Sequence, residues 1–227
     1  ASCNNYFYYL AAKHLDAGSF NQWARKLGCG DLTGIDLPTM GGSYDRGFLE
    51  NPEGVKGEKA LCMYGIGQVQ VQMTPLQALR MVGAVATGLK VAPRPWLVKK
   101  KTPDRIYTRN SRTAAIVQEC MKRVVSDPHG TVHGKFGLED FNFAAKTGTA
   151  QYKSNNSRYH SWMVGYGPLP DPSIAFVVVC EKSRLGGGDA CSPIVREFME
   201  YLAGGDPRFL ANQESSFNSS RETGAGR

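Results

Sequence analysis

The clearest pattern in the chain is a series of three segments with strand-like patterns of apolar and polar residues, at 143–152, 160–167 and 174–180. The breaks between them contain an Asn-Asn pair and the run LPDP, which suit hairpin or short-loop connections. The pattern therefore predicts an antiparallel meander. The last segment, IAFVVVC, is apolar throughout, and such a strand is covered on both faces. We expect an α/β (α+β) fold, with a mostly antiparallel sheet flanked by helices on both faces.

Helical periodicity predicts the covering helices. A helix over residues 74–88 should begin at TPLQ, which supplies a hydroxyl N-cap, a proline at the first position and a glutamine at the third. A second helix should start near Ser111 and end before the break SDPHG. In a third, Ser192 should be the cap and Pro193 the first helical residue, and the helix should end at Gly204.

The remaining segments have weaker patterns. The run YFYYLAAKHL shows helical spacing, so a helix should leave directly from the start of the chain. Residues 28–60 are rich in Gly, Pro, Asp and Thr and predict a long loop region. Beyond residue 207 the composition turns to Asn, Ser, Glu and Gly, which predicts a disordered polar tail over 208–227 after a single folded unit over 1–207.

Length and composition agree with one substantial domain, because the chain has 227 residues and is 41% hydrophobic. No window approaches about 18 uninterrupted apolar residues, so no transmembrane helix is predicted. The first residues lack the layout of a signal peptide, and the chain begins with Ala1. We therefore expect an excised piece or a processed product of a longer protein.

The net charge of +7 is concentrated between residues 99 and 123, a region whose only acids are Asp104 and Glu119. Nucleic acid, anionic lipid headgroups and acidic polymers could all bind a basic patch. A solvated surface is the favoured interpretation, since no aromatic interleaving or nucleic-acid motif accompanies the patch. No nucleic-acid partner is expected.

The six cysteines show no CxxC and no Cys/His spacing suited to zinc, so neither a metal nor another cofactor is predicted. Cys120 and Cys180 fall on apolar patterns and are interpreted as buried small hydrophobes. The even number of cysteines permits disulfides, but the sequence does not pair them. The glycine run at residues 186–188 lacks the Lys-Ser/Thr of a phosphate loop, and it predicts a flexible turn.

The segment AAKTGTAQ, within the first predicted strand, carries the candidate chemistry. Side chains alternate along a strand, so Lys146 and Gly148 should share one face while Thr147 and Thr149 share the other. Glycine lets a ligand lie close to the backbone. Ammonium and hydroxyl donors beside an exposed main-chain edge suit an extended peptide that ends in a carboxylate.

Several ordered segments give this motif a wider context: SCNNYFYYLA, GIGQVQVQMTPLQAL, HGTV, AAKTGTAQ, HSWMVGYGPLPDP, IAFVVVCE and GGGDACSPIVREF. Together they resemble the C-terminal part of the transpeptidase domain of class B penicillin-binding proteins, from Ser2 to about Leu202. KTGTAQ and GGGDACSPIVREF are more similar to elongation-type, penicillin-binding protein 2-like members than to septal ones. The resemblance implies a penicillin-binding transpeptidase / β-lactamase-like fold.

The resemblance also implies roles for the first residues of the chain. Ser2 and Asn4 match the family's Ser-x-Asn motif. In that motif the serine hydroxyl relays a proton during acylation. The asparagine amide holds the substrate's peptide carbonyl and a catalytic lysine. Without the resemblance, both residues could equally be caps of the first helix.

By the same resemblance, Lys146 matches the lysine of the Lys-Thr/Ser-Gly motif. It would tune the Ser2 hydroxyl and attract the terminal carboxylate of a D-alanyl-D-alanine stem peptide or of penicillin. Thr147, Gly148 and Thr149 would bind the substrate, the two threonines through their hydroxyls. The backbone N–H of Thr149 would form half of the oxyanion hole.

The nucleophile of this family is missing from the sequence. The reaction needs a serine activated by a lysine one helical turn later, and no Ser-x-x-Lys occurs here. The nearest match, Thr87-Gly-Leu-Lys90, straddles the glycine that ends a predicted helix. In the family the nucleophile precedes Ser-x-Asn, so we expect the parent protein to carry it upstream and this chain alone to be inactive.

The resemblance implies a peptidoglycan D,D-transpeptidase that cross-links the cell wall and maintains cell shape. Its partners would be D-Ala-D-Ala stem peptides, β-lactams, a glycosyltransferase and other elongation-complex membrane proteins. The parent would lie on the extracytoplasmic face of the bacterial envelope, anchored in the inner membrane by a segment outside this chain. Two alternatives are a β-lactam-hydrolysing or β-lactam-sensing relative and a non-catalytic scaffold that binds wall precursors.

Overall fold

The computed structural model describes most of the chain between residues 13 and 211. The described residues are 13–14, 16–35, 47–68, 71–92, 95, 105–106, 111–152 and 157–211. The predicted first helix lies almost wholly outside them, and so do Ser2, Asn4 and residues 212–227.

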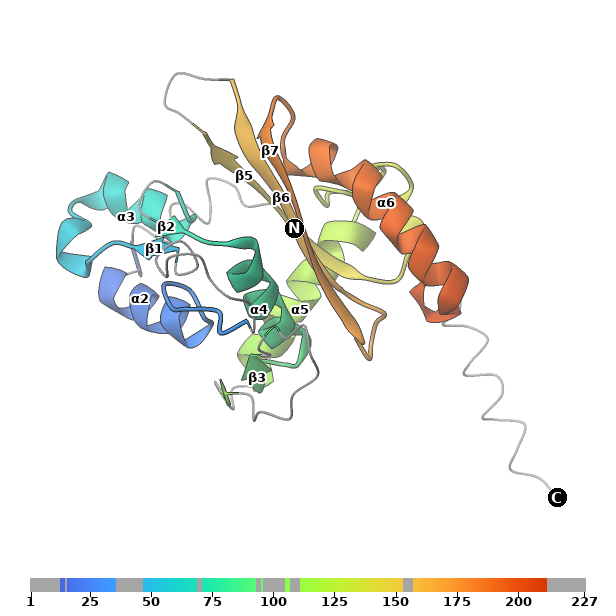
Figure 1. The fold of residues 1–227 in the computed structure, drawn as a ribbon, viewed down its shortest axis with the longest axis horizontal. Coiled ribbons are helices and arrows are strands. Elements are labelled where there is room, and N and C mark those ends of the chain that lie inside the picture. The colour runs from blue at the N-terminus through green and yellow to red at the C-terminus, as the bar shows by residue number, and fades with distance from the viewer. Residues whose placement is uncertain are drawn as a thin grey trace.

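A three-stranded antiparallel sheet forms the centre of the molecule (Figure 1). Its strands are β5 (Ala144–Gln151), β6 (Tyr159–Gly167) and β7 (Ile174–Ser183), in the order β5-β6-β7. The predicted meander is therefore confirmed. Within the described residues β5 is an edge strand, paired only with β6.

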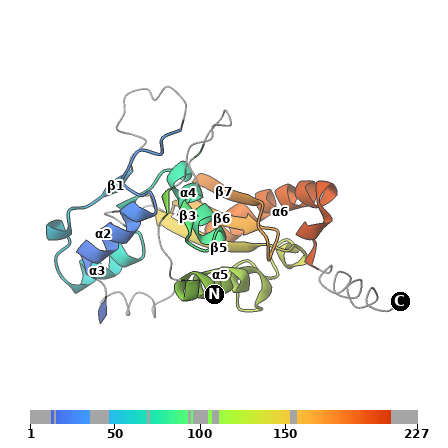
Figure 2. The same cartoon turned by 90° about the horizontal axis from the view of Figure 1, so that it is seen from below.

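Helices cover both faces of this sheet, as the apolar run IAFVVVC of β7 requires (Figures 1 and 2). On one face, Met163 of β6 packs in a cluster with Val195 of α6 (Gly187–Gly205). On the other face, the next residue, Val164, packs against the cluster that contains Val82 of α4 (Pro75–Ala86). Alternation along the strand therefore separates the two cores.

The helix α5 (Ser111–Ser126) contacts β5 and contributes to both clusters. Its buried residues are Ala114, Met121, Val124 and Val125. Cys120 lies to the side of this stripe and is exposed, so its predicted burial is wrong. Cys180 is partly buried and packs against the α6 side of the sheet.

The sequence predicted the start of α4 correctly and that of α6 incorrectly. In α4 the hydroxyl of Thr74 accepts from the N–H of Gln77 at 3.2 Å, and the Gln77 side chain accepts from the N–H of Thr74 at 2.9 Å. By contrast, α6 begins at Gly187, so Pro193 lies inside the helix. The predicted flexible turn is thus the first turn of α6.

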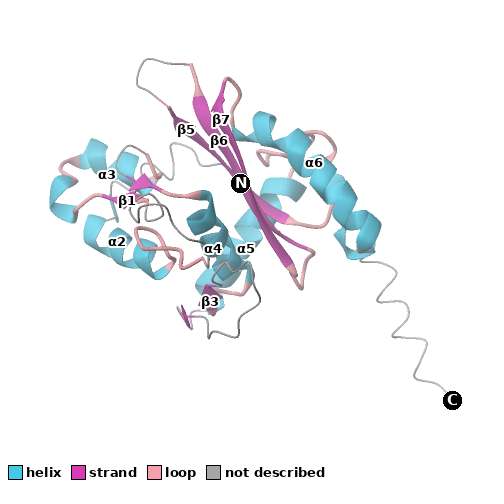
Figure 3. Cartoon of the chain, viewed as in Figure 1, coloured by secondary structure: helices cyan, strands magenta, loops and turns pink. Residues whose placement is uncertain are grey.

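A small lobe lies on the side of the sheet away from α6 (Figures 1–3). It contains α2 (Ala17–Lys26), β1 (Phe48–Leu49), the 3-10 turn η2 (Pro52–Gly54), α3 (Glu58–Gly65) and β2 (Val71–Gln72). The fully buried Tyr64 donates its hydroxyl proton to Asn21, whose amide donates to the carbonyl of Glu50 at 2.8 Å. The predicted loop over 28–60 therefore contains short elements held by a buried polar network.

Two short strands, β3 (Val91–Ala92) and β4 (Arg105–Ile106), form an antiparallel pair between α4 and α5. A second 3-10 turn, η3 (Leu138–Asp140), precedes β5. The rest of the predicted basic region around residues 99–110 lies outside the described residues.

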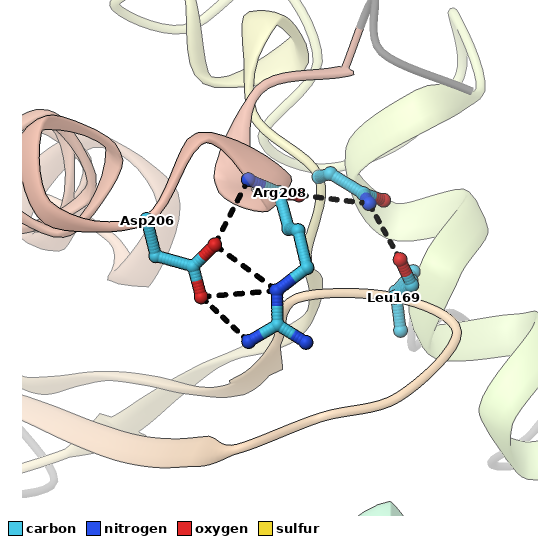
Figure 4. A network of polar contacts seen from close by, with 4 residues as sticks. Leu169, Asp206 and Arg208 are labelled. Atoms are coloured by element: carbon cyan, nitrogen blue, oxygen red, sulfur yellow. Dashed lines mark hydrogen bonds and ion pairs between the residues drawn. The ribbon is translucent and has the colours of Figure 1, made fainter. Parts of the chain in front are cut away.

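The chain remains ordered past the boundary predicted at residue 207. Pro207–Phe209 form a 3-10 turn, η4, and Phe209 is 1% exposed in the α6 core. Asp206 caps this turn by accepting from the N–H of Arg208 at 3.1 Å and also pairs with its guanidinium at 2.6 Å (Figure 4). Asn142 joins the same region by donating to the carbonyls of Leu169 at 2.7 Å and Arg208 at 3.1 Å. The polar composition after residue 207 gave no sign that Phe209 is buried.

Candidate active site

The outer edge of β5 presents main-chain groups of alternate residues. The carbonyl of Thr149 accepts from the Gln68 side chain at 3.1 Å, and that of Thr147 accepts from the Lys146 ammonium at 2.5 Å. Both carbonyls therefore point away from β6. In an antiparallel pair the N–H and C=O of one residue point to the same side. The N–H groups of Thr147 and Thr149 consequently also face the outer edge.

The side chains of β5 divide as the alternation predicted. Lys146 pairs with Val164, and Gly148 pairs with Trp162, on the α4 side of the sheet. A Cβ atom at Gly148 would lie 3.4 Å from the Cβ of Trp162, which is ordinary contact. Gly148 therefore leaves the backbone of β5 open beside the Lys146 ammonium.

Thr149 is fixed by the first turn of α6. Its hydroxyl oxygen accepts from the backbone N–H of Gly187 at 3.0 Å. Gly187 approaches the sheet so closely that a Cβ atom there would overlap the carbonyl oxygen of Gly148 and lie 2.7 Å from that of Trp162. The Thr149 hydroxyl thus receives an N–H and retains its own proton to donate elsewhere.

Thr147 is fixed by the segment between α5 and β5. Its hydroxyl lies 2.9 Å from the hydroxyl of Thr131. The segment is held against α6 by an ion pair between Lys135 and Asp189, and by Arg196, which donates to the carbonyl of Phe136 at 2.7 Å. Asp189 lies in the first turn of α6, where its negative charge interacts favourably with the positive end of the helix dipole.

The structure therefore brings together four of the predicted site residues, Lys146, Thr147, Gly148 and Thr149, on one exposed strand edge. It does not describe Ser2 and Asn4. Sequence reasoning assigned no role to Gln68 or Thr131 and placed Gly187 only in a flexible turn beside the site. The structure shows that these three residues hold the strand from three separate segments. Gln68 and Thr131 lie in the quoted segments GIGQ and HGTV, but hydrophobic periodicity says nothing of their partners.

The described residues contain no group of three or more His, Cys, Asp or Glu side chains that could hold a metal ion. None of the helices among these residues has the length and apolar character needed to span a bilayer. His160, at the start of β6, packs its ring edge-on against Tyr152, with the ring centroids 5.1 Å apart.

The geometry agrees with a comparison of the whole chain with protein families. The model described as the penicillin binding protein transpeptidase domain matches residues 1–200. The chain belongs to this family. This class B, penicillin-binding protein 2-like transpeptidase segment is 33% identical over 221 residues to the peptidoglycan D,D-transpeptidase MrdA of Acinetobacter baumannii. That match covers 83% of this chain and 32% of the relative.

Solved structures of transpeptidases share the fold. Penicillin-binding protein 2 of Helicobacter pylori, in a complex with MreC, superposes with a TM-score of 0.74 at 23% identity, over 87% of this chain and 38% of that one. Penicillin-binding protein 2 of Pseudomonas aeruginosa, in complex with WCK 5153, gives 0.72 at 26% identity, over 92% of this chain and 49% of that one. The transpeptidase segment spans about a third of the length of the curated relatives it matches.

Proposed function

We propose that this chain is part of a peptidoglycan D,D-transpeptidase that cross-links stem peptides through a serine acyl-enzyme and binds penicillin. The observation that carries the proposal is the outer edge of β5. The side chains reach this edge from both faces: Lys146 from the α4 side, with its ammonium on the Thr147 carbonyl at the edge, and Thr147 and Thr149 from the α6 side, with the N–H of Thr149 on the edge between them. An acyltransferase needs this set of donors for a peptide that ends in a carboxylate.

Each donor has a role in the proposed reaction. The extended end of a stem peptide pairs with the edge of β5, and the open backbone at Gly148 lets it approach closely. The ammonium of Lys146 and the hydroxyls of Thr147 and Thr149 bind the terminal carboxylate of D-Ala-D-Ala. The N–H of Thr149 stabilises the oxyanion that forms when the scissile carbonyl is attacked.

The attacking serine comes from a part of the protein outside the printed sequence, because no Ser-x-x-Lys occurs in it. Ser2 relays the proton from that serine to the leaving D-alanine, and Asn4 holds the substrate carbonyl. The acyl group then passes to an amine of a neighbouring stem. These roles rest on the match to the Ser-x-Asn motif.

The same proposal implies where the parent protein is located and which proteins it assembles with. The substrate lies in the cell wall, so the parent acts on the extracytoplasmic face of the envelope and is anchored by a segment outside this chain. Its partners are a glycosyltransferase and other membrane proteins of wall elongation. The Helicobacter pylori relative that was solved with MreC supports this assignment.

Acylation by fluorescent penicillin tests the proposal on the full-length protein. The wild type should form a stable covalent adduct, and Lys146→Ala should lower the second-order acylation rate by about 10²-fold or more. Lys122, exposed on α5, provides the matched control, and Lys122→Ala should acylate as the wild type does.

The alternatives give different results in the same experiment. A β-lactam-hydrolysing relative would form the adduct and release it within seconds to minutes, with turnover of the antibiotic. A non-catalytic scaffold would form none. Unchanged acylation of Lys146→Ala would contradict the role of the lysine.

A further inference from the structure

Two cysteines from different elements meet on the α6 side of the sheet. Cys180 lies near the end of β7 and Cys191 lies in the second turn of α6, and the two elements are adjacent (Figures 1 and 2). Their Sγ atoms are 4.0 Å apart. Cys191 is fully buried, with its thiol 3.4 Å from the carbonyl of Ser161, whereas Cys180 is partly exposed. Both are free thiols here.

We propose that Cys180 and Cys191 form a disulfide site. The disulfide forms by thiol–disulfide exchange with an oxidised small molecule, such as oxidised glutathione, or with a protein disulfide. A disulfide needs the two sulfurs to approach from van der Waals contact to about 2.05 Å, and side-chain rotation can supply much of that distance. The pair lies eleven positions apart in sequence, on two elements that already pack together. Closure therefore joins two elements that are already adjacent.

The thiol of Cys180 should react first, because it is more exposed to solvent than that of Cys191. The Cys180 thiolate attacks oxidised glutathione, which breaks that disulfide, forms a mixed disulfide at Cys180 and releases one glutathione thiolate. Cys191 then loses its proton to solvent and attacks the Cys180 sulfur, which releases the second glutathione. The protein pair loses two electrons and oxidised glutathione gains them.

The second step should be the slow one. Burial raises the pKa of the Cys191 thiol above its ordinary value, so little thiolate is present at neutral pH. The closure rate should therefore increase between pH 7 and pH 8.5.

The disulfide would close the turn that carries the contacts to the site. Residues 181–190 include Leu185, whose carbonyl accepts from the Ser161 hydroxyl at 2.5 Å, and Gly187, whose N–H binds Thr149. A covalent link at both ends of this turn fixes the first turn of α6 against β5 and β6. The oxidised protein should therefore be more stable, and its Thr149 contact should persist to a higher temperature.

Peptide mapping of the full-length protein tests the proposal directly. After incubation with oxidised glutathione, alkylation and digestion with trypsin, Cys180 falls in peptide 159–182 and Cys191 in peptide 185–196. We expect these two peptides joined, two hydrogen atoms lighter than their sum, and separated by a reductant. Cys120, exposed in peptide 113–122, should carry glutathione alone and report that the oxidant was active. Separately alkylated Cys180 and Cys191 beside a modified Cys120 would overturn the proposal.

Thermal unfolding provides the second measurement. Closing a loop of this length should raise the Tm by about 5 °C in oxidised glutathione. The gain should be kept in Cys120→Ser and lost in Cys180→Ser, which retains a small side chain at a partly exposed position. An equal gain in Cys180→Ser would show that the effect does not come from this pair.

Discussion

The hydroxyl of Thr149 and the backbone N–H of Gly187 join the edge strand β5 to the first turn of α6, at a distance of 3.0 Å. The bond depends on a close approach of two backbones, since a side chain at Gly187 would overlap the carbonyl of Gly148. The glycine run at the start of α6 is therefore a packing contact that positions one wall of the proposed site.

Gly187→Ala should destabilise the protein and disturb the site together. Its Cβ atom would meet the backbone oxygens of Gly148 and Trp162, which cannot rotate away as a flexible side chain could. We expect a loss of about 1–3 kcal/mol in the free energy of unfolding. Urea unfolding measures it, and acylation by fluorescent penicillin should slow in the same variant.

Gly204, in the last turn of the same helix, provides the matched control. A Cβ atom there would have nothing within 4 Å. Gly204→Ala should be neutral or stabilise the protein by up to about 1 kcal/mol, because alanine favours the helix. A neutral Gly187→Ala would contradict the packing role assigned to Gly187.

Hydrophobic periodicity and turn residues were sufficient to predict several of the regular helices and strands of the fold. The three strands, their antiparallel order, the Thr74 capping box and the start of α5 at Ser111 all follow from periods of 2 and 3.6 and from turn residues. The division of Lys146 and Thr147 between two faces follows from strand alternation alone.

Individual tertiary contacts could not be predicted from these patterns. The first turn of α6 reads as a flexible glycine run, and only the neighbouring strands show why Gly187 must lack a side chain. Phe209 lies in the segment that composition assigned to a polar tail, and the composition gave no sign that its side chain is buried in the core. The bonds from Gln68 and Thr131 to the site join residues distant in sequence, and a single sequence carries no record of such pairs.

Asp206 should make the stability of the C-terminal turn depend on pH. The side-chain hydrogen bond from Arg208 lowers the pKa of the Asp206 carboxyl below its usual value of 3.8, with further help from the backbone N–H of Arg208. A carboxyl with a depressed folded-state pKa adds stability above its unfolded pKa, and this stability is lost as the pH falls through the folded value. The contribution should therefore be complete at pH 6 and decline below about pH 4.

Asp206→Asn provides the comparison, because asparagine can still cap the turn but cannot form the ion pair. The Tm of the wild type should exceed that of Asp206→Asn at pH 6, and the difference should shrink as the pH is lowered towards 3. A difference that stays constant over this range would show that the charge of Asp206 does not contribute.

The 227-residue chain, produced alone, should form no covalent adduct with fluorescent penicillin, because its sequence contains no Ser-x-x-Lys. The full-length protein, labelled in parallel, provides the positive control. Circular dichroism should first establish that the isolated chain is folded. A stable, stoichiometric adduct on any residue of this chain would contradict the absence of a nucleophile.

Thr131→Val should weaken recognition of the substrate carboxylate. The Thr131 hydroxyl lies 2.9 Å from that of Thr147 and orients it, and valine keeps the shape while removing the bond. Loss of a bond worth about 0.5–1.5 kcal/mol should slow acylation about 3- to 10-fold. Thr131→Ser, which keeps the hydroxyl, should restore most of the rate.

A penicillin methyl ester separates this role from a general loss of structure. The ester has no carboxylate for Thr147 to bind, so wild type and Thr131→Val should react with it at similar, slow rates. If instead the variant loses the same factor with the ester as with penicillin, Thr131 supports the strand as a whole, and Thr147 has no selective role in carboxylate binding. If Thr131→Val keeps the wild-type rate with the ester but reacts more slowly with penicillin, the Thr131–Thr147 pair acts in binding the carboxylate. In the proposed mechanism, Lys146 binds the same carboxylate at the edge of β5.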